Sequence, residues 1–185
     1  MPCVSPEITF NRLAQTCRAG YYTKLLLVFG LLQPRDVSES IMQQKNSFQE
    51  LLRQCRSVAV VGAKDKPEQP VDRVGRYLLE RGMRVCPVHP VRQDVWGLPT
   101  VPHLADLTEP VDIVDLFRAP QYCVGHAREV LALPWRPRIF WMQSGITSPD
   151  ARALLEPEGI LVVEDACLMV ELGRLTATAP ALERP

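Results

Sequence analysis

One short loop combines residue types that suit phosphate binding. Lys64 and Lys66 follow Gly62, and a helix is predicted to begin near Val71. A glycine lets the backbone turn sharply, lysines supply positive charge, and the N-terminus of a helix attracts anions. These residues therefore predict an anion site for a phosphate group. The alternative interpretation is an ordinary solvated loop with two exposed cations.

Residues after the other predicted strands could complete such a site. His89 and Pro90 follow the second strand, and Arg118 follows the third as either a bidentate phosphate partner or a surface cation. Gln143 to Gly145 follows the fourth strand as a loop facing a ligand or as an ordinary tight turn.

The usual nucleotide fingerprints are missing. The chain reads GAKDKP after the first strand, without the further glycines of G-x-G-x-x-G, and His89 stands where a dinucleotide site wants an acid. A P-loop, H-E-x-x-H and G-x-S-x-G are also absent, so we predict no catalytic residues. His89, His103 and His126 lie too far apart to predict a metal site.

Alternating strands and helices must position these residues. Five short apolar runs read as buried parallel strands, numbered one to five along the chain: 57–62, 83–88, 111–117, 138–142 and 160–164. Helices are predicted at 71–81, 120–133, 148–158 and 167–175. The pattern predicts an α/β fold: a Rossmann-like, doubly wound five-stranded parallel sheet with helices on both faces. We expect the strand order 3-2-1-4-5, with the ligand between strands one and four.

Length and composition set further limits. The chain of 185 residues has 21 Lys plus Arg and 21 Asp plus Glu, so no overall charge attracts nucleic acid or a membrane. The six cysteines form no C-x-x-C, which predicts reduced thiols and a cytoplasmic protein. No apolar run is long enough to cross a bilayer, although the first forty residues leave organelle targeting open.

We divide the chain into three parts. Residues 1–41 form an N-terminal extension without a clear period, for which disorder is one interpretation. Residues 42–175 form one Rossmann-like domain, which begins with a helix whose capping box is Ser47 and Glu50. Residues 176–185 are predicted to be a flexible tail.

The motifs together resemble a known family, with a likeness that covers roughly residues 50–172. The matching stretches are VAVVGAKDKPEQPVDRVGRYLLERGMRVCPVHP, VDIVDLFRAP, IFWMQSGI and GILVVEDACLMVE. They are similar to the small single-domain CoA-binding proteins and to the CoA-binding domain of the succinyl-CoA synthetase alpha subunit. The resemblance implies that CoA or an acyl-CoA lies over the carboxyl ends of the strands. The implied cofactor-binding residues are Gly62, Ala63, Lys64, Lys66, Arg73, His89, Pro90, Phe117, Arg118, Gln143, Ser144 and Gly145.

The chain also departs from the family pattern. Family members usually have a hydroxyl residue at Lys64, often another near Val71, Asn at His89 and Arg at Ala166. The synthetase's phosphohistidine segment has no counterpart, so ligase activity is not implied.

We therefore predict non-catalytic binding of CoA or an acyl-CoA. The alternatives are an NAD(P)-dependent oxidoreductase on the same fold, or an interaction protein that has lost its ligand. Cys167 lies near the first turn of the last predicted helix, on the same edge of the sheet as the ligand. We therefore also hypothesise that it forms a mixed disulfide with CoA, against the alternative of a packed, unreactive thiol. The sequence leaves a homodimer open.

Overall fold

A computed structural model describes the backbone of residues 34–177 and the side chains of residues 42–175. The chain divides into two units, Met1–Glu50 and Leu51–Pro185. Helix α3 (Pro34–Gln54) occupies the described part of the first unit. Of the predicted N-terminal extension, residues 1–33 lie outside the described residues, and residues 34–41 are helical. Of the predicted tail, residues 178–185 lie outside the described residues.

The predicted start of the first helix is wrong. Helix α3 begins at Pro34, and Ser47 lies well inside it. The Ser47 hydroxyl donates a 2.8 Å hydrogen bond to the Gln44 carbonyl, one turn back. Serine makes such bonds within helices as well as at their ends, so its side chain does not mark a boundary here.

Five parallel strands form the sheet of the second unit. They are β1 (Ser57–Val61), β2 (Arg84–Val88), β5 (Ile113–Leu116), β6 (Ile139–Met142) and β7 (Leu161–Val163). The order is β2-β1-β5-β6-β7, and all neighbours pair in parallel. The predicted Rossmann-like class is confirmed, but the predicted strand order is wrong because the third predicted strand pairs with the first and not beyond the second.

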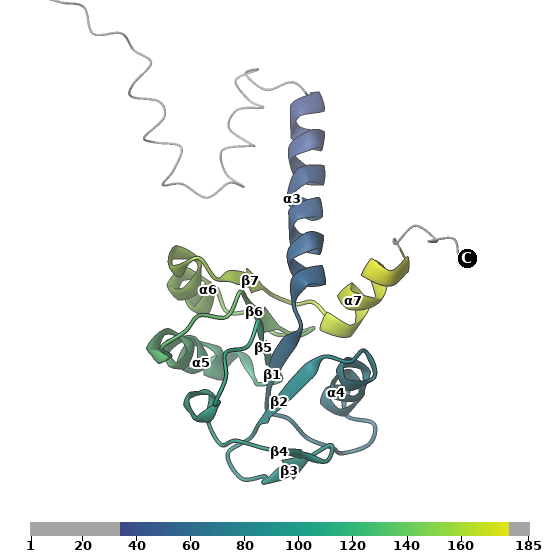
Figure 1. The fold of residues 1–185 in the computed structure, drawn as a ribbon. Helices are drawn as coiled ribbons and strands as arrows, with labels where there is room; N and C mark the ends of the chain where they lie inside the picture. Colours follow the sequence, from purple (N-terminus) through teal and green to yellow (C-terminus); the bar gives the residue numbers. More distant parts are fainter. Residues whose placement is uncertain (1–33, 178–185) are drawn as a thin grey trace, which may run out of the picture. The chain divides into compact units, whose positions relative to one another are not determined.

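Helices cover both faces of this sheet, as Figure 1 shows. On one face lie α5 (Pro120–Ala132) and α6 (Pro149–Leu155), with the 3-10 turn η3 (Glu156–Glu158) after α6. On the other lie α4 (Pro70–Glu80) and α7 (Leu168–Ala177). Helices α4, α5 and α6 each begin with a proline, whose missing N–H is not needed there.

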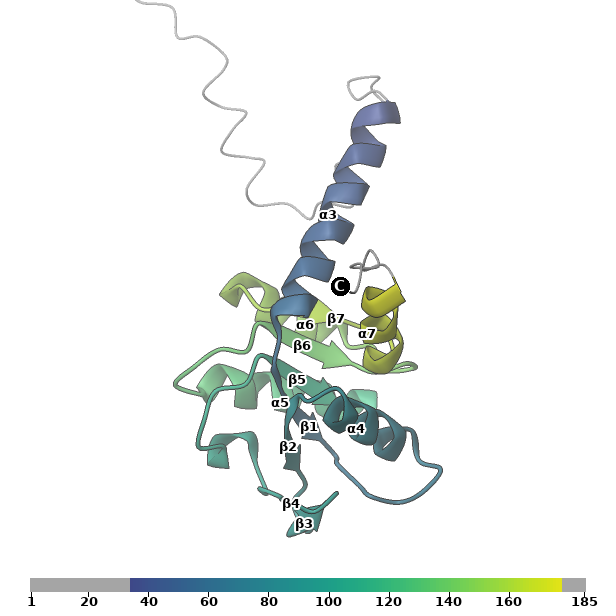
Figure 2. The ribbon, with the colours of Figure 1, turned by 45° about the vertical axis from the view of Figure 1, so that its right-hand side comes forward.

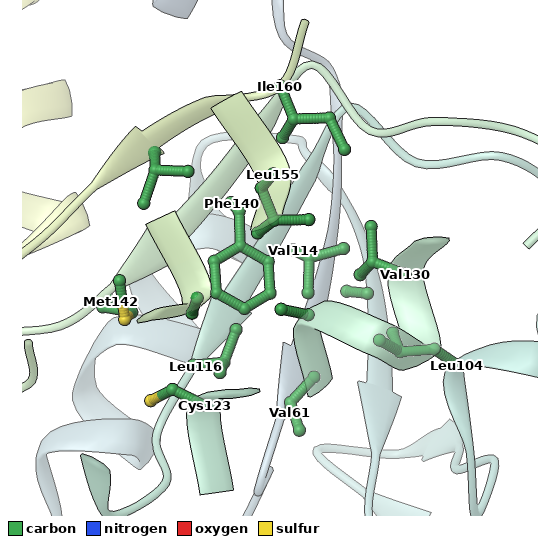
Figure 3. Packing of buried hydrophobic residues seen from close by; sticks show 14 of the residues in the cluster. Val61, Leu104, Val114, Leu116, Cys123, Val130, Phe140, Met142, Leu155 and Ile160 are labelled. Carbon is green, nitrogen blue, oxygen red and sulfur yellow. The ribbon is translucent and has the colours of Figure 1, made fainter. Parts of the chain in front are cut away.

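A hydrophobic core cluster lies between the sheet and the α5/α6 layer (Figure 3). Alternate residues of β5 and β6, such as Val114 and Phe140, are fully buried in it. Burying one large apolar side chain contributes roughly 1.5–3 kcal/mol. The sheet is therefore a rigid base for the loops at its carboxyl edge.

A small hairpin follows β2, in a stretch where the sequence predicted no strand. Strands β3 (Asp94–Val95) and β4 (Leu98–Pro99) pair antiparallel next to β2 (Figure 2). Trp96 and Gly97 form the turn, with φ of 59° and 75°. Two consecutive positive φ angles are typical of the tight type I′ hairpin turn. The Trp96 ring lies against Gly75 of α4. The 3-10 turn η2 (Leu104–Asp106) follows the hairpin.

Candidate functional site

The point where the chain reverses direction across the sheet lies between β1 and β5. After β1 the chain enters α4 on one face, and after β5 it enters α5 on the other. Such a divergence leaves a crevice at the carboxyl ends of the strands, where ligands of open α/β folds bind. The predicted place of the ligand, between strands one and four, is therefore wrong. The crevice lies between strands one and three, which are β1 and β5.

A cavity of about 470 Å³ lies at this point, and we call it the large cavity. Its wall comes from the ends of β1, β5 and β6 and from the beginnings of α4 and α7. The lining residues are Gly62, Lys64, Gln69, Pro70, Val71, Val74, Phe117, Arg118, Ala119, Gln143, Ser144, Ile146 and Cys167. The volume falls in the range of small-molecule and cofactor sites.

Gly62 permits the loops after β1 and β5 to touch. Its φ is +88°, and a Cβ there would lie 2.7 Å from the Phe117 carbonyl oxygen. A side chain at this position would therefore separate the two loops. The Gly62 and Ala63 N–H groups donate to the Val88 carbonyl at 2.9 and 3.3 Å. These two donors hold the loop against the end of β2.

Arg118 has an unsatisfied donor at the edge of the large cavity. Its Nε is buried and has no hydrogen-bond partner among the described residues. Its guanidinium carbon lies 5.2 Å from the centre of the Tyr122 ring, within cation–π distance. An unpaired buried donor costs about 1–3 kcal/mol, and more when it is charged. The site therefore favours a ligand with an anionic acceptor.

A smaller cavity of about 180 Å³ adjoins the large one. It is lined by Val61, Gly62, Val88, Pro90, Pro102, His103, Arg118, His126 and Glu129. Gly62 and Arg118 line both cavities. His126 Nδ1 lies 3.0 Å from Glu129 Oε2, and Glu129 Oε1 accepts a 2.8 Å hydrogen bond from the Leu104 N–H. Both oxygens of the Glu129 carboxylate thus have partners within hydrogen-bond distance, whereas Arg118 Nε has none among the described residues.

His89 belongs to the same cationic edge. Burial lowers its pKa, and the positive charges of Lys64, Arg92 and Arg118 lower it further. Its Nδ1 accepts hydrogen bonds from the N–H groups of Val91 and Arg92 at 3.2 and 3.3 Å. The ring therefore stands unprotonated at Nδ1 and holds the loop after β2, while the neighbouring cations set the charge of this edge.

A buried polar pair lies beneath the large cavity. Asp115, in the middle of the sheet, is fully buried, and Gln143 is 5% exposed. Gln143 Nε2 donates to both Asp115 carboxyl oxygens, at 2.8 and 3.0 Å. Burial raises the pKa of Asp115 to about 7, although the hydrogen bond from Gln143 opposes the rise.

The residues after Gln143 form a tight turn. The Ile146 N–H donates to the Gln143 carbonyl at 2.9 Å, and Gly145 has a φ of +80°. The Gly145 N–H donates a 2.7 Å hydrogen bond to Asp165 Oδ1, away from any ligand. Ser144 lines the large cavity and is exposed.

The structure brings together six of the predicted site residues around the large cavity: Gly62, Lys64, Phe117, Arg118, Gln143 and Ser144. Pro90 lines the smaller cavity. Arg73 lies elsewhere, lining a surface pocket with Asp72 and Arg76. Lys66 lines neither the large nor the smaller cavity.

Sequence reasoning missed part of the wall. Val74, Gln69 and Ile146 line the large cavity, although none of them is among the predicted site residues. A signal was present, because Val71 and Val74 lie one turn apart at the start of the helix that follows the glycine loop. Cys167 also lines the cavity, consistent with its predicted place at the same edge of the sheet.

Two further findings concern the described residues alone. Residues 42–175, whose side chains are described, contain no group of three His, Cys, Asp or Glu side chains suited to a metal ion. Among the helices of residues 34–177, none has the length and apolar character needed to cross a membrane.

Comparison with known proteins assigns the family. A family model described as CoA binding domain matches residues 56–173. YneT of Bacillus subtilis is 30% identical over 126 residues, covering 68% of this chain and 92% of YneT. The chain therefore belongs to the CoA binding domain family, as the resemblance in its motifs predicted.

Solved structures agree with this assignment. The protein ID.343 from Thermus thermophilus is 46% identical, with a TM-score of 0.66 over 70% of this chain and 97% of that one. A protein from Pyrococcus horikoshii OT3 is 29% identical, with a TM-score of 0.67 over 71% and 91% of the two chains. Both are similar to this chain over nearly their whole length.

Proposed function

We propose that this protein binds CoA or an acyl-CoA in the large cavity and catalyses no reaction. Membership of the CoA binding domain family supports a CoA ligand. The observation that carries the proposal for this chain is the Arg118 guanidinium at the cavity edge, which makes no hydrogen bond or ion pair with any described residue. A phosphate oxygen is a suitable acceptor for it, because guanidinium and phosphate groups form strong charge-assisted hydrogen bonds.

The surrounding charges support the same ligand. Lys64 lines the cavity, and its positive charge, with those of Arg92 and Arg118, adds to burial in lowering the pKa of His89. The large cavity also receives the N-terminus of α4, whose positive dipole end favours anions. Apolar residues such as Val71 and Val74 line the rest and suit an uncharged arm.

A non-catalytic role is part of the proposal. Catalysis of group transfer needs a nucleophile, a base and an orienting group within reach of one another. The ionisable groups of the large cavity are Lys64, Arg118 and Cys167, and no histidine or carboxylate lines it. Binding by charge and shape needs none of those catalytic groups.

Calorimetric titration of the full chain with CoA, acetyl-CoA and NADH tests the proposal. We expect binding of CoA or acetyl-CoA and no binding of NADH. Tight NADH binding would favour the oxidoreductase, and a folded protein that binds none of the three would favour an interaction protein. Arg118→Gln should weaken CoA at least tenfold. Arg128→Gln, an exposed position on α5 outside both cavities, serves as the matched control.

A further inference from the structure

The Asp115–Gln143 pair has an energetic cost that the fold does not explain. Asp115 is fully buried in the central strand β5, and its strand neighbours in the register are Val60 and Trp141. No salt bridge to it is found among the described residues, and its side-chain hydrogen bonds come from Gln143 alone. A buried carboxyl group without a cation is costly, and an apolar residue of similar size would often be more stable there.

The hydrogen bonds of the pair fix which way the Gln143 amide faces. Above about pH 7 Asp115 is a carboxylate, which only accepts hydrogen bonds, so it requires the NH₂ end of the amide. Both carboxyl oxygens of Asp115 accept from Gln143 Nε2. The carbonyl oxygen Oε1 is therefore turned away from Asp115.

That oxygen is available to a ligand. Gln143 lines the large cavity, and no hydrogen bond to its Oε1 is found in the described part of the chain. Gln143 Oε1 is not fully buried either. Among the described residues, Arg118 Nε is the one fully buried side-chain nitrogen or oxygen without a hydrogen-bond partner. The floor of the cavity thus presents an acceptor, whereas Lys64 and Arg118 at its edge are donors.

We propose that Asp115 is a positioning residue that holds the Gln143 carbonyl oxygen toward the large cavity, where it accepts a hydrogen bond from an amide N–H of the pantetheine arm of CoA. The inference rests on the proposed function and deepens it. The phosphates carry no N–H group and match the cations at the edge. The arm is the uncharged part of CoA, and its amides match an acceptor set among Val71, Val74 and Ile146.

The test compares two ligands and three variants of the full chain. The ligands are CoA and adenosine 3′-phosphate 5′-diphosphate, which has the nucleotide but no arm. The variants are Gln143→Leu, Asp115→Asn and the double variant. We expect Gln143→Leu to weaken CoA binding about tenfold and Asp115→Asn about threefold or more, without changing the affinity for the nucleotide.

The double variant separates positioning from a merely structural role. If Asp115 acts through Gln143, the double variant binds CoA as Gln143→Leu does, because the second change has nothing left to orient. Asparagine both donates and accepts, so it fills the site of Asp115 without fixing the amide. Asp115→Asn should also melt at a higher temperature than the wild type at pH 8, while it binds CoA less tightly. Structural damage by Asp115→Asn would lower both the melting temperature and the affinity for CoA.

Several results would overturn the inference. These are unchanged CoA affinity in Gln143→Leu, equal losses for both ligands, or additive losses in the double variant. In each of these cases the wild type still binds CoA, so the proposed function stands. If the wild type bound neither CoA nor the nucleotide, the proposed function would be wrong and this inference with it.

Discussion

The indole Nε1 of Trp96 donates a 2.8 Å hydrogen bond to Oδ1 of Asp72, which connects the β3–β4 hairpin to the first turn of α4. Arg76 Nε donates to the same carboxylate at 3.0 and 3.1 Å. The neighbouring residues Pro70 and Val71 form part of the wall of the large cavity. The hairpin therefore holds the start of α4 in place beside the large cavity, although it contributes no residue to the cavity lining.

Gly75→Ala should destabilise the protein by about 1–3 kcal/mol, the usual cost of overpacking a filled site. A Cβ at Gly75 would lie 2.2 Å from two carbon atoms of the Trp96 ring, which Asp72 holds in place. Urea denaturation measures the change. Gly125→Ala on α5 is the matched control, because its Cβ would meet nothing within 4 Å. The control should be more stable by up to about 1 kcal/mol, and equal stability of both variants would contradict the contact.

Lys64→Ala should weaken CoA binding about tenfold, and Lys66→Ala by less than about threefold. Both lysines are exposed in the same loop, but Lys64 lines the large cavity and Lys66 does not. The sequence alone does not distinguish the two lysines. The difference in CoA affinity between Lys64→Ala and Lys66→Ala therefore tests the structure. Calorimetric titration in parallel measures it, and equal losses would show that only the charge of the loop matters.

The stability of the wild type should fall as the pH rises from 4 to 8 because of Asp115. Burial raises its pKa from 3.8 to about 7, so the fold favours the protonated form. The stabilisation is complete below the ordinary pKa and is lost as the pH rises through the folded value. The loss is on the order of 4 kcal/mol. Thermal melts of wild type and Asp115→Asn across this range check it, and parallel curves would contradict it.

Cys167 should form a disulfide with CoA faster than the other cysteines of the described chain. Its thiolate attacks one sulfur of CoA disulfide, the S–S bond breaks, and a CoA thiolate leaves. Burial raises the pKa of the Cys86 and Cys123 thiols, and that of Cys55 to about 11, so these three hold less thiolate than an ordinary cysteine does. Cys167 lines the large cavity.

Peptide mass spectrometry after incubation with CoA disulfide locates the adduct. Oxidised glutathione at the same concentration is the control, because it lacks the nucleotide and should modify Cys167 more slowly. Adducts on Cys86 with Cys167 unmodified would instead support the packed, unreactive thiol.

The sequence predicted the strands and helices of the sheet domain well, because the pattern that indicates each of them lies within a short stretch of the chain. The five apolar runs and the prolines at the helix starts each depend on a few neighbouring residues, and they fall within a residue or two of the observed bounds. Strand order depends on pairing between distant segments, which similar apolar runs do not distinguish. One signal was nevertheless present. Pro87 in β2 has no N–H for a second neighbour, which is typical of an edge strand, and β2 is an edge strand.

The site was predictable where a residue directly follows a strand. Lys64, Arg118 and Gln143 meet at one cavity because the carboxyl ends of parallel strands share an edge. The β3–β4 hairpin was not predictable, because a tryptophan rarely takes the positive φ that Trp96 has. The role of Asp115 was hidden as well, since its partner Gln143 lies 28 residues further along the chain.

Because Arg118 lines both cavities, two anions that each pair with its guanidinium do not bind independently. An anion that pairs with the guanidinium from one side reduces what is left for an anion on the other, which is negative thermodynamic linkage between the two spaces. Such linkage is reciprocal, so each occupant lowers the affinity of the other by the same factor. A single ligand long enough to reach both sides would avoid this competition, because one Arg118 would then serve one molecule.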